Sequence, residues 1–387
     1  RQGYDFMDTA HLAWAQAQLK TRELWLTQRK HCEYDLLLGI EQKLYGHLCY
    51  LQEAITEPDL SDEENRALNL CIFAFRPDFR EAPDHLAAQL LETGMEPWLE
   101  DLQTAIDITG AQNWQPLLHT LIEQTDLTDP THWWLKSRLH DVPPAVDSDV
   151  SHVSWSQAIP GQIPCLVKSR AWKSDTVFDT WISEARDSVQ NEDRQEDLHW
   201  LALGLLATDK QPAAIDLIQR WITASPDSRY AWRTAAASGA SEFIQPLQQA
   251  VLDEHIPPFW LVVHGDAAHL DFCVDLLSKP HTNPLAERAW YGFTGERLPR
   301  VPVIKLGTKE KGDRLADATT ARQWLEVNQP TGRLCLGHDH SDRPFRPQLG
   351  RFFGADTEPV TSAIWLDTQG GTLLSPTECH WQRAQRL

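Results

Sequence analysis

The chain has 387 residues, of which 42% are hydrophobic and 23% are charged. This composition is typical of a globular protein and excludes a disordered chain, and at about 150 residues per domain the length predicts two or three domains. No apolar run reaches the roughly 18 residues needed to cross a bilayer, and the N-terminal RQGYDFMD lacks the basic-then-apolar order of a secretion signal. We therefore expect a cytoplasmic protein with no membrane partner.

Acidic residues outnumber basic residues by 55 to 35, which gives a formal net charge of −20. Phosphate backbones are bound by clustered Lys and Arg, so this balance argues against a nucleic-acid partner. A partner that is steered by charge would be basic. The acids are concentrated in residues 53–107, which hold 14 acids and three bases.

Seven cysteines lie far apart and form no C-x-x-C pair: Cys32, Cys49, Cys71, Cys165, Cys273, Cys335 and Cys379. This pattern is typical of reduced thiols in a core, and it favours neither a disulfide framework nor a zinc site. No motif predicts a cofactor.

Residues 1–140 are predicted to form an acidic, all-α N-terminal domain. Between Asp8 and Glu53 there is no Pro, and apolar residues recur at three- and four-residue steps. We therefore expect two packed helices, the first beginning near Ala10 with Asp8 as its cap. Ser61 and Glu64 have the spacing of a capping box for the next helix, and further helices are expected at 84–93, 96–108 and 114–125.

Residues 141–176 are predicted to be a Pro/Ser-rich linker or a structured crossover. Pro143, Pro144, Pro160 and Pro164 lie in this stretch, and each of them forbids a regular helix interior.

Residues 177–295 are predicted to form HEAT-like helical repeats. Three stretches share one layout, an apolar helix, a polar or Pro-containing turn and a second helix: 212–224 with 228–238, 241–253 with 258–263, and 267–279 with 284–294. Helix pairs at a spacing near 30 residues are typical of a HEAT or armadillo α-solenoid, in which each hairpin buries its face against its neighbours. The predicted fold class is therefore mostly α, an α-helical N-terminal domain followed by an α-solenoid of helical hairpins.

Residues 296–387 are predicted to be a C-terminal segment with a charged loop at 307–314 and final helices. A helix is expected near 317–328, and 301–306 is expected to pair as a short strand.

The densest set of metal-ligand residue types is His338-Asp339-His340-Ser341-Asp342. His338 and His340 share a side only in an extended chain, and zinc needs three or four ligands, so a polar turn is the favoured interpretation. A second set, His264, Asp266, His269 and Asp271, lies at a turn and a helix start, where Asp is ordinary capping chemistry. We therefore predict no metal.

Five acidic residues fall together on a turn and a first helical turn: Glu57, Asp59, Asp62, Glu63 and Glu64. Acids at this position favour the helix dipole and stay solvated, whereas a general acid or base needs a desolvated pocket. The chain also contains no G-x-S-x-G and no H-E-x-x-H. We interpret the five acids as a partner-binding surface and predict that the protein is not an enzyme.

Tryptophan is abundant, with 17 residues. Trp14, Trp181, Trp200, Trp221 and Trp232 fall in apolar helical registers and are predicted to be core residues, since large aromatics are mostly buried. Others are candidates for interface anchors.

Three groups of residues resemble one family of proteobacterial HEAT-like repeat proteins of unassigned function, whose genes often accompany type VI secretion components. The groups are Leu24-Trp25, Arg29, Tyr34, Leu37, Leu44, His47-Leu48 and Leu51; then Gly265-Asp266, Leu285-Ala286-Glu287-Arg288-Ala289 and Phe293-Thr294-Gly295; then Gly332-Arg333-Leu334, Leu336-Gly337 and Trp381-Gln382-Arg383. The match covers both ends of the chain and leaves about 55–200 without support. These are mostly packing residues, so the resemblance implies a fold more than an activity.

The gene neighbourhood of that family implies an immunity protein that neutralises a cognate type VI secretion effector, such as a basic nuclease toxin. The physical logic is a non-enzymatic scaffold whose acidic surface binds a basic protein. Two alternatives are open: an adaptor or chaperone that loads an effector onto the secretion apparatus, and a metal-dependent enzyme that uses His338 and His340. The oligomeric state is not predicted.

Overall fold

The computed structural model describes residues 6–27, 34–56, 58–76, 79, 83–138, 153–169, 176–208, 210–302, 314–339, 358–367 and 379–386. Within these ranges there are nineteen helices: α1 (Phe6–Thr27), α2 (Tyr34–Ala54), α3 (Arg66–Phe75), α4 (Pro83–Thr93), α5 (Leu99–Thr109), α6 (Ala111–Gln124), α7 (Pro130–Lys136), α8 (Gln162–Lys168), α9 (Thr176–Ala185), α10 (Gln195–Leu206), α11 (Gln211–Ala224), α12 (Arg229–Ser238), α13 (Ile244–Leu252), α14 (Phe259–His264), α15 (His269–Leu277), α16 (Asn283–Thr294), α17 (Ala318–Asn328), α18 (Glu358–Asp367) and α19 (His380–Arg386).

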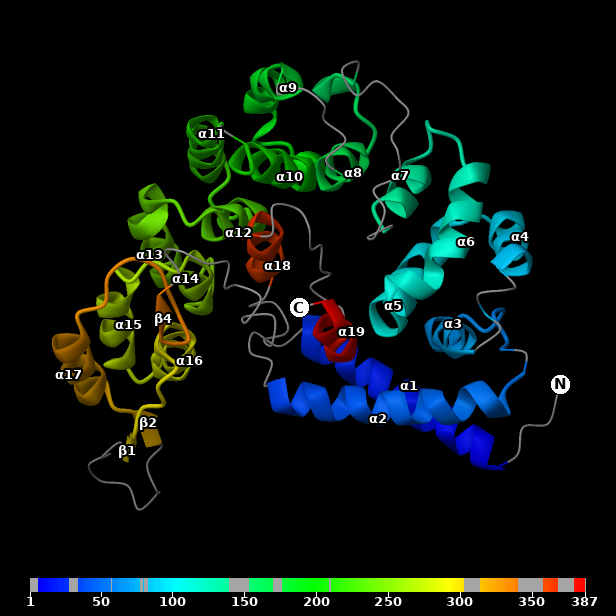
Figure 1. The fold of residues 1–387 in the computed structure, drawn as a ribbon, viewed down its shortest axis with the longest axis horizontal. Helices are drawn as coiled ribbons and strands as arrows, with labels where there is room; N and C mark the ends of the chain where they lie inside the picture. Colours follow the sequence, from blue (N-terminus) through cyan, green and yellow to red (C-terminus); the bar gives the residue numbers. More distant parts are fainter. Residues whose placement is uncertain are drawn as a thin grey trace.

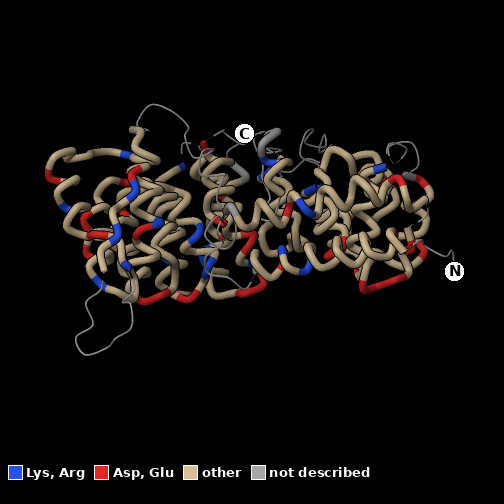
Figure 2. The backbone as a smooth tube through the Cα atoms, turned by 90° about the horizontal axis from the view of Figure 1, so that it is seen from below, with Lys and Arg blue, Asp and Glu red and all other residues tan. Residues whose placement is uncertain are grey.

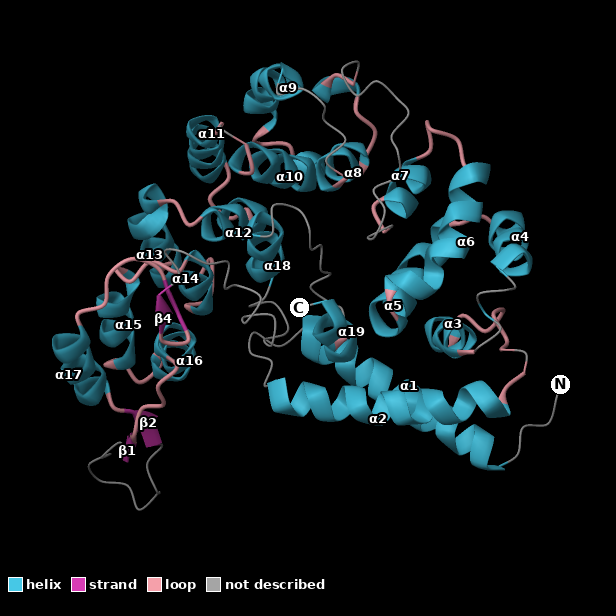
Figure 3. Ribbon diagram, viewed as in Figure 1, coloured by secondary structure: helices cyan, strands magenta, loops and turns pink. Residues whose placement is uncertain are grey.

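Strands are few and short in the described ranges (Figure 3). Two antiparallel ribbons pair β1 (Arg300–Pro302) with β2 (Arg314–Ala316) and β3 (Leu334–Cys335) with β4 (His338–Asp339). The prediction of a mostly α chain is confirmed, and helices lie where they were expected at 84–93, 96–108, 114–125 and 317–328. No helix in the described part of the chain is long and apolar enough to cross a bilayer.

The helices follow an arc that starts at α1 and α2, passes α5, α7 and α10, and reaches α16 and α17 (Figure 1). The last two helices, α18 and α19, lie on the inner side of this arc. Elements that are far apart in sequence are therefore neighbours, because α18 packs on α12 and α14, and α19 packs on α5.

The described residues form two large hydrophobic cores and a small cluster of Trp25, Leu26 and Leu37 between α1 and α2. The first is built from α1 to α6 and the second from α8 to α18, and α7 contributes Leu135 to the first and Trp133 to the second. Residues 153–169, which fall in the predicted linker or crossover, contain η4 (Trp155–Gln157) and α8 and add Trp155 and Ile163 to the second core. Pro164 is tolerated in α8 because it lies in the first turn, where its missing N–H has no partner to lose.

The three predicted hairpins correspond to α11 with α12, α13 with α14, and α15 with α16. Contacts run along two rows: α10, α12, α14 and α16 pack in succession, and α13, α15 and α17 pack in succession beside them. Helices α11 and α12 pack on each other, as do α15 and α16, and all of these helices contribute to one hydrophobic core.

The turn around β3 packs on the ends of α14 and α16. These helices end at Gly265 (φ 85°) and Gly295 (φ 70°), whose left-handed conformations favour glycine. The Leu334 N–H donates to the Gly265 carbonyl (2.8 Å), and the Gly337 N–H donates to the Phe293 carbonyl (2.9 Å). The glycine-containing motifs near residues 265, 295 and 332–337 are therefore parts of one packing unit.

Polar side chains hold α18 on α12. His199 is fully buried, and its two ring nitrogens lie 2.7 Å from Thr234 Oγ1 and 3.0 Å from Ser362 Oγ. At the surface, Arg229 Nε donates to Glu358 Oε2 at 2.7 Å. Buried polar groups must be hydrogen-bonded, so this network specifies how α18 is seated.

A buried ion pair holds the C-terminal helix on the N-terminal half. Arg22 of α1 donates from Nε to Glu41 Oε1 of α2 at 2.7 Å, and both side chains are almost fully buried. The second Glu41 oxygen accepts from the His380 backbone N–H at 2.9 Å and lies 2.5 Å from His380 Nδ1. Burial alone would raise the pKa of Glu41, but Arg22 and His380 together lower it to about 2.

The start of α19 also satisfies the end of α5. Cys379 donates its N–H to the Asp107 carbonyl, and Trp381 donates its indole Nε1–H to the Ile108 carbonyl, each at 2.9 Å. The last carbonyls of a helix have no partner within the helix, so α19 supplies donors that α5 lacks. Gly110 (φ 91°) lies beside this contact, and the end of the Gln382 side chain approaches it where another residue would carry a Cβ.

We predict that Glu41→Gln lowers the free energy of unfolding by about 3–5 kcal/mol at pH 7, because it leaves Arg22 buried without a counterion. The folded-state pKa of Glu41 lies below its ordinary value of 4.5, so its contribution is present above that pH and is lost as the pH falls towards 2. Urea denaturation between pH 7 and pH 3 measures this, and the acid-side slope should be shallower in the variant.

The matched control is Asp275→Asn, which removes an exposed pair with Arg322 (3.2 Å). An exposed pair contributes about 0–1 kcal/mol, so this change should be small at every pH. Equal losses in the two variants would contradict a structural role for the buried pair.

Candidate protein-binding surface

The predicted acidic turn is held in place by its own side chains. The Asp59 carboxylate accepts from the Ser61 N–H (3.0 Å) and Oγ–H (2.6 Å), and the Asp62 carboxylate accepts from the Glu64 N–H (3.2 Å) and Asn65 Nδ2 (2.8 Å). The bonds from Ser61 lower the pKa of Asp59. Both carboxylates are therefore held in place within a defined loop. Of the five predicted residues, Glu57 lies outside the described residues.

The capping box expected at Ser61 and Glu64 is wrong. Helix α3 begins at Arg66, and its N-cap, Asn65, makes no side-chain cap bond. Asp59 and Asp62 fold residues 59–65 into turns instead, since Asp side chains readily bond to backbone two residues on. Glu64 is directed away from Ser61 to Lys20 of α1, whose Nζ lies 2.8 Å from Glu64 Oε1.

The side chains of Glu63 and Glu64 are 87% and 74% exposed. They protrude from a loop that is fixed on two sides, because Gln16 of α1 donates to the Glu64 carbonyl (2.8 Å) and Asn69 of α3 donates to the Asp59 carbonyl. The result is a cluster of outward carboxylates with little freedom to reorganise. Preorganised charge of this kind reduces the entropy lost on binding.

Arg66 joins the acidic loop to the start of α5, a connection that the sequence did not reveal. Its guanidinium donates to the Leu60 carbonyl (3.4 Å) and to the Asp101 carboxylate (3.4 Å), and lies 3.6 Å from Glu63. It also stacks over the Trp98 ring at 4.5 Å. One cation therefore holds two acidic segments together.

The acidic surface extends from the loop to Glu100 and Asp101. Burial raises the pKa of Asp101, Arg66 opposes the change, and the nearby charges of Glu100 and Glu63 raise it further. Burial is the largest of these effects, and the acidic charges of Glu100 and Glu63 add to it. In Figure 2, acidic positions also mark the N-terminal end and recur along the lower edge of the molecule.

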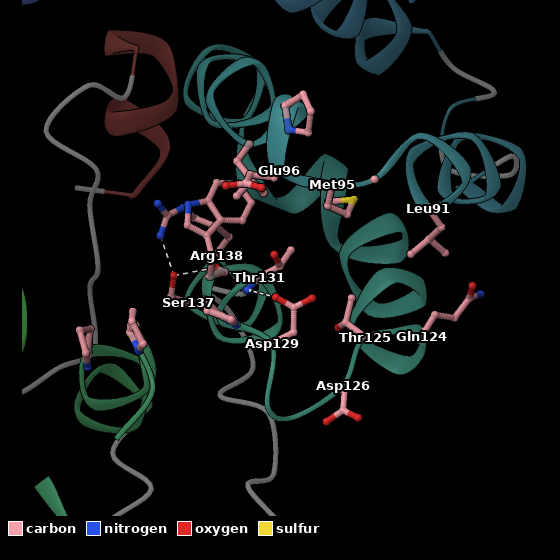
Figure 4. Close-up of a pocket in the computed structure, with 18 of the residues that line it drawn as sticks. Leu91, Met95, Glu96, Gln124, Thr125, Asp126, Asp129, Thr131, Ser137 and Arg138 are labelled. Carbon is pink, nitrogen blue, oxygen red and sulfur yellow. Dashed lines mark hydrogen bonds between the residues drawn. The ribbon is translucent and has the colours of Figure 1, made fainter. Parts of the chain in front are cut away.

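A cleft of about 980 Å³ opens next to this surface, between η2 (Glu96–Trp98), α5, α6, α7 and α8. Its lining includes four acids and one base: Glu96, Asp126, Asp129, Glu196 and Arg138. Figure 4 shows Glu96 and Met95 above Asp129, Thr131 and Arg138 of the α7 region. The cleft therefore continues the negative surface towards the inner side of the arc.

An aromatic patch lies on α1 and α2, where the expectation of a core residue is wrong. Trp14 is 51% exposed, because the face of α1 that carries it is left uncovered. His11 stacks on Tyr50 with ring centroids 4.0 Å apart, and the His11 and His47 Nδ1 atoms are 3.1 Å apart. The other predicted core tryptophans are buried as expected, namely Trp181, Trp200, Trp221 and Trp232.

Of the two histidines of the predicted metal alternative, one lies in the described residues. His338 lies on β4, and His340 is outside the described ranges. In the part of the chain that is described, no three His, Cys, Asp or Glu side chains converge as a metal set.

His264 and His269, from the second predicted set, form a buried pair. The His269 Nε2 atom lies 3.1 Å from His264 Nδ1, and burial lowers the pKa of His269 to about 3. Asp266 accepts from the Ala268 N–H in the turn before α15, but the N-cap of α15 is Ala268 and no side chain caps the helix, so the predicted capping role is wrong.

The cysteines are free thiols where they are described, and five of them are buried: Cys71, Cys165, Cys273, Cys335 and Cys379. Burial raises the pKa of Cys71 to about 12. Thiols of this kind are poor nucleophiles, in agreement with the prediction of reduced core cysteines.

The comparisons with known proteins add no relative. No family model matches the sequence, and no curated protein and no solved structure is significantly similar to it.

We predict that Arg66→Ala releases the acidic loop. Asp101 loses a charged partner and Trp98 loses its stacked cation, so the free energy of unfolding should fall by about 1–3 kcal/mol. Amide hydrogen exchange in residues 59–65 should accelerate, while exchange in α16 stays unchanged. Arg66→Lys is the matched control: it keeps the charge without the planar fork and should restore part of the protection. Unaltered exchange of the loop in Arg66→Ala would show that Arg66 does not anchor it.

Proposed function

We propose that the protein is a non-enzymatic scaffold that binds a basic protein partner. The observation that carries this proposal is the acidic loop, in which exposed Glu63 and Glu64 stand beside Asp59 and Asp62 in a hydrogen-bonded turn. Lys20 and Arg66 balance part of this charge, and the side chains of Glu63 and Glu64 remain largely exposed, so they are available to a basic partner.

Two neighbouring features support the same function. The acid-lined cleft offers a recess next to the loop, and exposed Trp14 and Tyr50 supply aromatic surface at the same end of the chain. Charge complementarity mainly accelerates encounter, whereas buried aromatic anchors supply most of the affinity. We assign the acceleration of encounter to the acids and most of the affinity to the aromatic patch.

We further propose the more specific function that the resemblance implies, an immunity protein that neutralises a cognate basic effector of type VI secretion. In this proposal the helix pairs from α11 to α16 form a HEAT-like array that carries the binding end. The stacking of these pairs in two rows supports the proposal.

The electrostatic part of the proposal predicts that charge reversal in the acidic loop slows association with the partner. The variant Asp59→Lys, Asp62→Lys, Glu63→Lys and Glu64→Lys should reduce the association rate constant at least about tenfold at low salt, with a difference that shrinks as salt rises. The probe is the purified product of the adjacent open reading frame, measured by stopped-flow or surface plasmon resonance.

The matched control reverses four exposed acids elsewhere: Asp187, Glu192, Asp193 and Asp271. Both variants change the net charge equally, so only a local effect separates them. Equal rates in the two variants would remove the loop from the binding surface.

Co-expression tests the immunity role. The protein should rescue cells from the effector, and the loop variant should rescue them less well than the control variant. An effector that is exported only when this protein is present, with no rescue, would favour the adaptor instead.

A further inference from the structure

A second cavity of about 350 Å³, the α1–α5 pocket, lies between α1 and α5, and Trp134 of α7 adds to its lining. The residues that line it on α1 recur at steps of three or four from Leu19 to Leu26, and those on α5 do so from Leu99 to Asp107. Residues at this spacing share one face of a helix. The pocket is therefore formed by one face of each helix, and its volume is near the lower end of the roughly 300–1,000 Å³ that is typical of ligand sites.

The α1–α5 pocket has apolar walls. Leu19 and Leu26 are buried and Leu99 is half-buried, and the indole of Trp134 belongs to the same lining. Leu99 and Trp134 also line the larger acid-lined cleft, so the two cavities are neighbours. The pocket is therefore a smaller recess beside the surface that we propose for the basic partner.

The charged residues of this lining are acidic with one exception, Arg22. Glu23 of α1 and Glu100 of α5 are exposed, whereas Asp107 of α5 is 4% exposed, so carboxylates lie on both helices and in the buried part of the pocket. Arg22 Nε donates to Glu41 at 2.7 Å, and Glu41 lies outside the lining. The lining therefore carries three acids and one base that is already paired, which gives it a negative charge.

The buried carboxylate and the indole are both held in position. Gln103 Nε2 donates to Asp107 Oδ1 at 2.9 Å, and Gln103 in turn accepts a hydrogen bond from Arg138 Nε. The Arg138 guanidinium also stacks over the Trp134 ring at 4.5 Å. Groups that are fixed before a ligand arrives lose little entropy on binding, so the pocket is preorganised.

We propose that the α1–α5 pocket binds an arginine side chain of the basic partner. The methylene groups of the arginine pack on the leucines and on Trp134, and its planar guanidinium donates to carboxylates on both helices. A purely apolar side chain would cover the same leucines but offer Glu23 and Glu100 no donor, and lysine is more strongly hydrated and lacks the planar fork. This inference rests on the proposed function, and it names the residue type that the basic partner presents.

The test titrates the whole protein with a blocked glycine–arginine–glycine tripeptide, with binding measured by saturation-transfer difference NMR at fixed ionic strength. We expect saturable binding that is about tenfold tighter than that of the same tripeptide with norleucine, because norleucine keeps the apolar stem without the donors. The lysine tripeptide should bind about threefold more weakly than the arginine tripeptide.

Two variants locate the binding in the pocket. Glu100→Gln should weaken the arginine tripeptide about threefold and leave the norleucine tripeptide unchanged, because it removes a charge and not an apolar wall. Thr104→Arg should abolish binding, because Thr104 is a half-buried lining residue and the new side chain occupies the pocket with a guanidinium of this chain. Circular dichroism checks that both variants are folded.

The matched control is Glu192→Gln, which removes an exposed acid of η6 (Glu192–Arg194) outside the pocket and should leave binding unchanged. The absence of saturable binding of the arginine tripeptide to the unmodified protein would overturn the proposal. Equal affinity for the lysine or the norleucine tripeptide would also overturn it, as would an equal loss in Glu100→Gln and Glu192→Gln.

The proposed function and the arginine pocket can fail separately. If charge reversal in the acidic loop slows association with the partner while no tripeptide binds, the protein-binding function is retained and the arginine pocket is rejected. If the arginine tripeptide binds as expected while the loop variant and its control associate at equal rates, the pocket is retained and the acidic loop is rejected.

Discussion

The contact between α19 and the pair α2 and α5 is the constraint on which the arrangement of the two halves depends. Each half has its own hydrophobic core, and α7 contributes residues to both cores. The C-terminal segment adds a second connection, with α18 in the second core and Cys379 in the first. Because Glu41 offers one oxygen to Arg22 and the other to His380, removing either partner leaves a buried charge incompletely paired.

Acidic side chains are concentrated near the N-terminal end of the molecule (Figure 2). The net charge of −20 is displayed partly on a rigid loop at the N-terminal end, where Arg66 is the cation that ties Asp101 to Glu63. Arg138 and Lys168 lie over tryptophan rings on the inner side of the arc, and Lys168 also lies 3.8 Å from the Glu196 carboxylate.

Local features were predictable and long-range ones were not. Apolar periodicity located α4, α6 and α17 because helix registers repeat within a few residues. Trp14 was correctly predicted to lie in a helix, but the exposure of its side chain depends on which face of α1 another helix covers. The acidic turn was recognised by composition, whereas its anchor spans 35 residues from Arg66 to Asp101. The Glu41–His380 contact spans 339 residues, and a single sequence carries no signal for it.

Helix α5 relates the candidate surface to the C-terminal contact. The first turn of α5 carries Asp101, which accepts a hydrogen bond from Arg66 next to the acidic loop. The last carbonyls of α5 accept hydrogen bonds from the start of α19. Eleven residues at 1.5 Å each separate these ends by about 16 Å of regular helix. Coupling between two sites requires an element that has two discrete arrangements. A helix that is bonded at both ends offers a single arrangement. The acidic loop and α19 are therefore held by opposite ends of one helix.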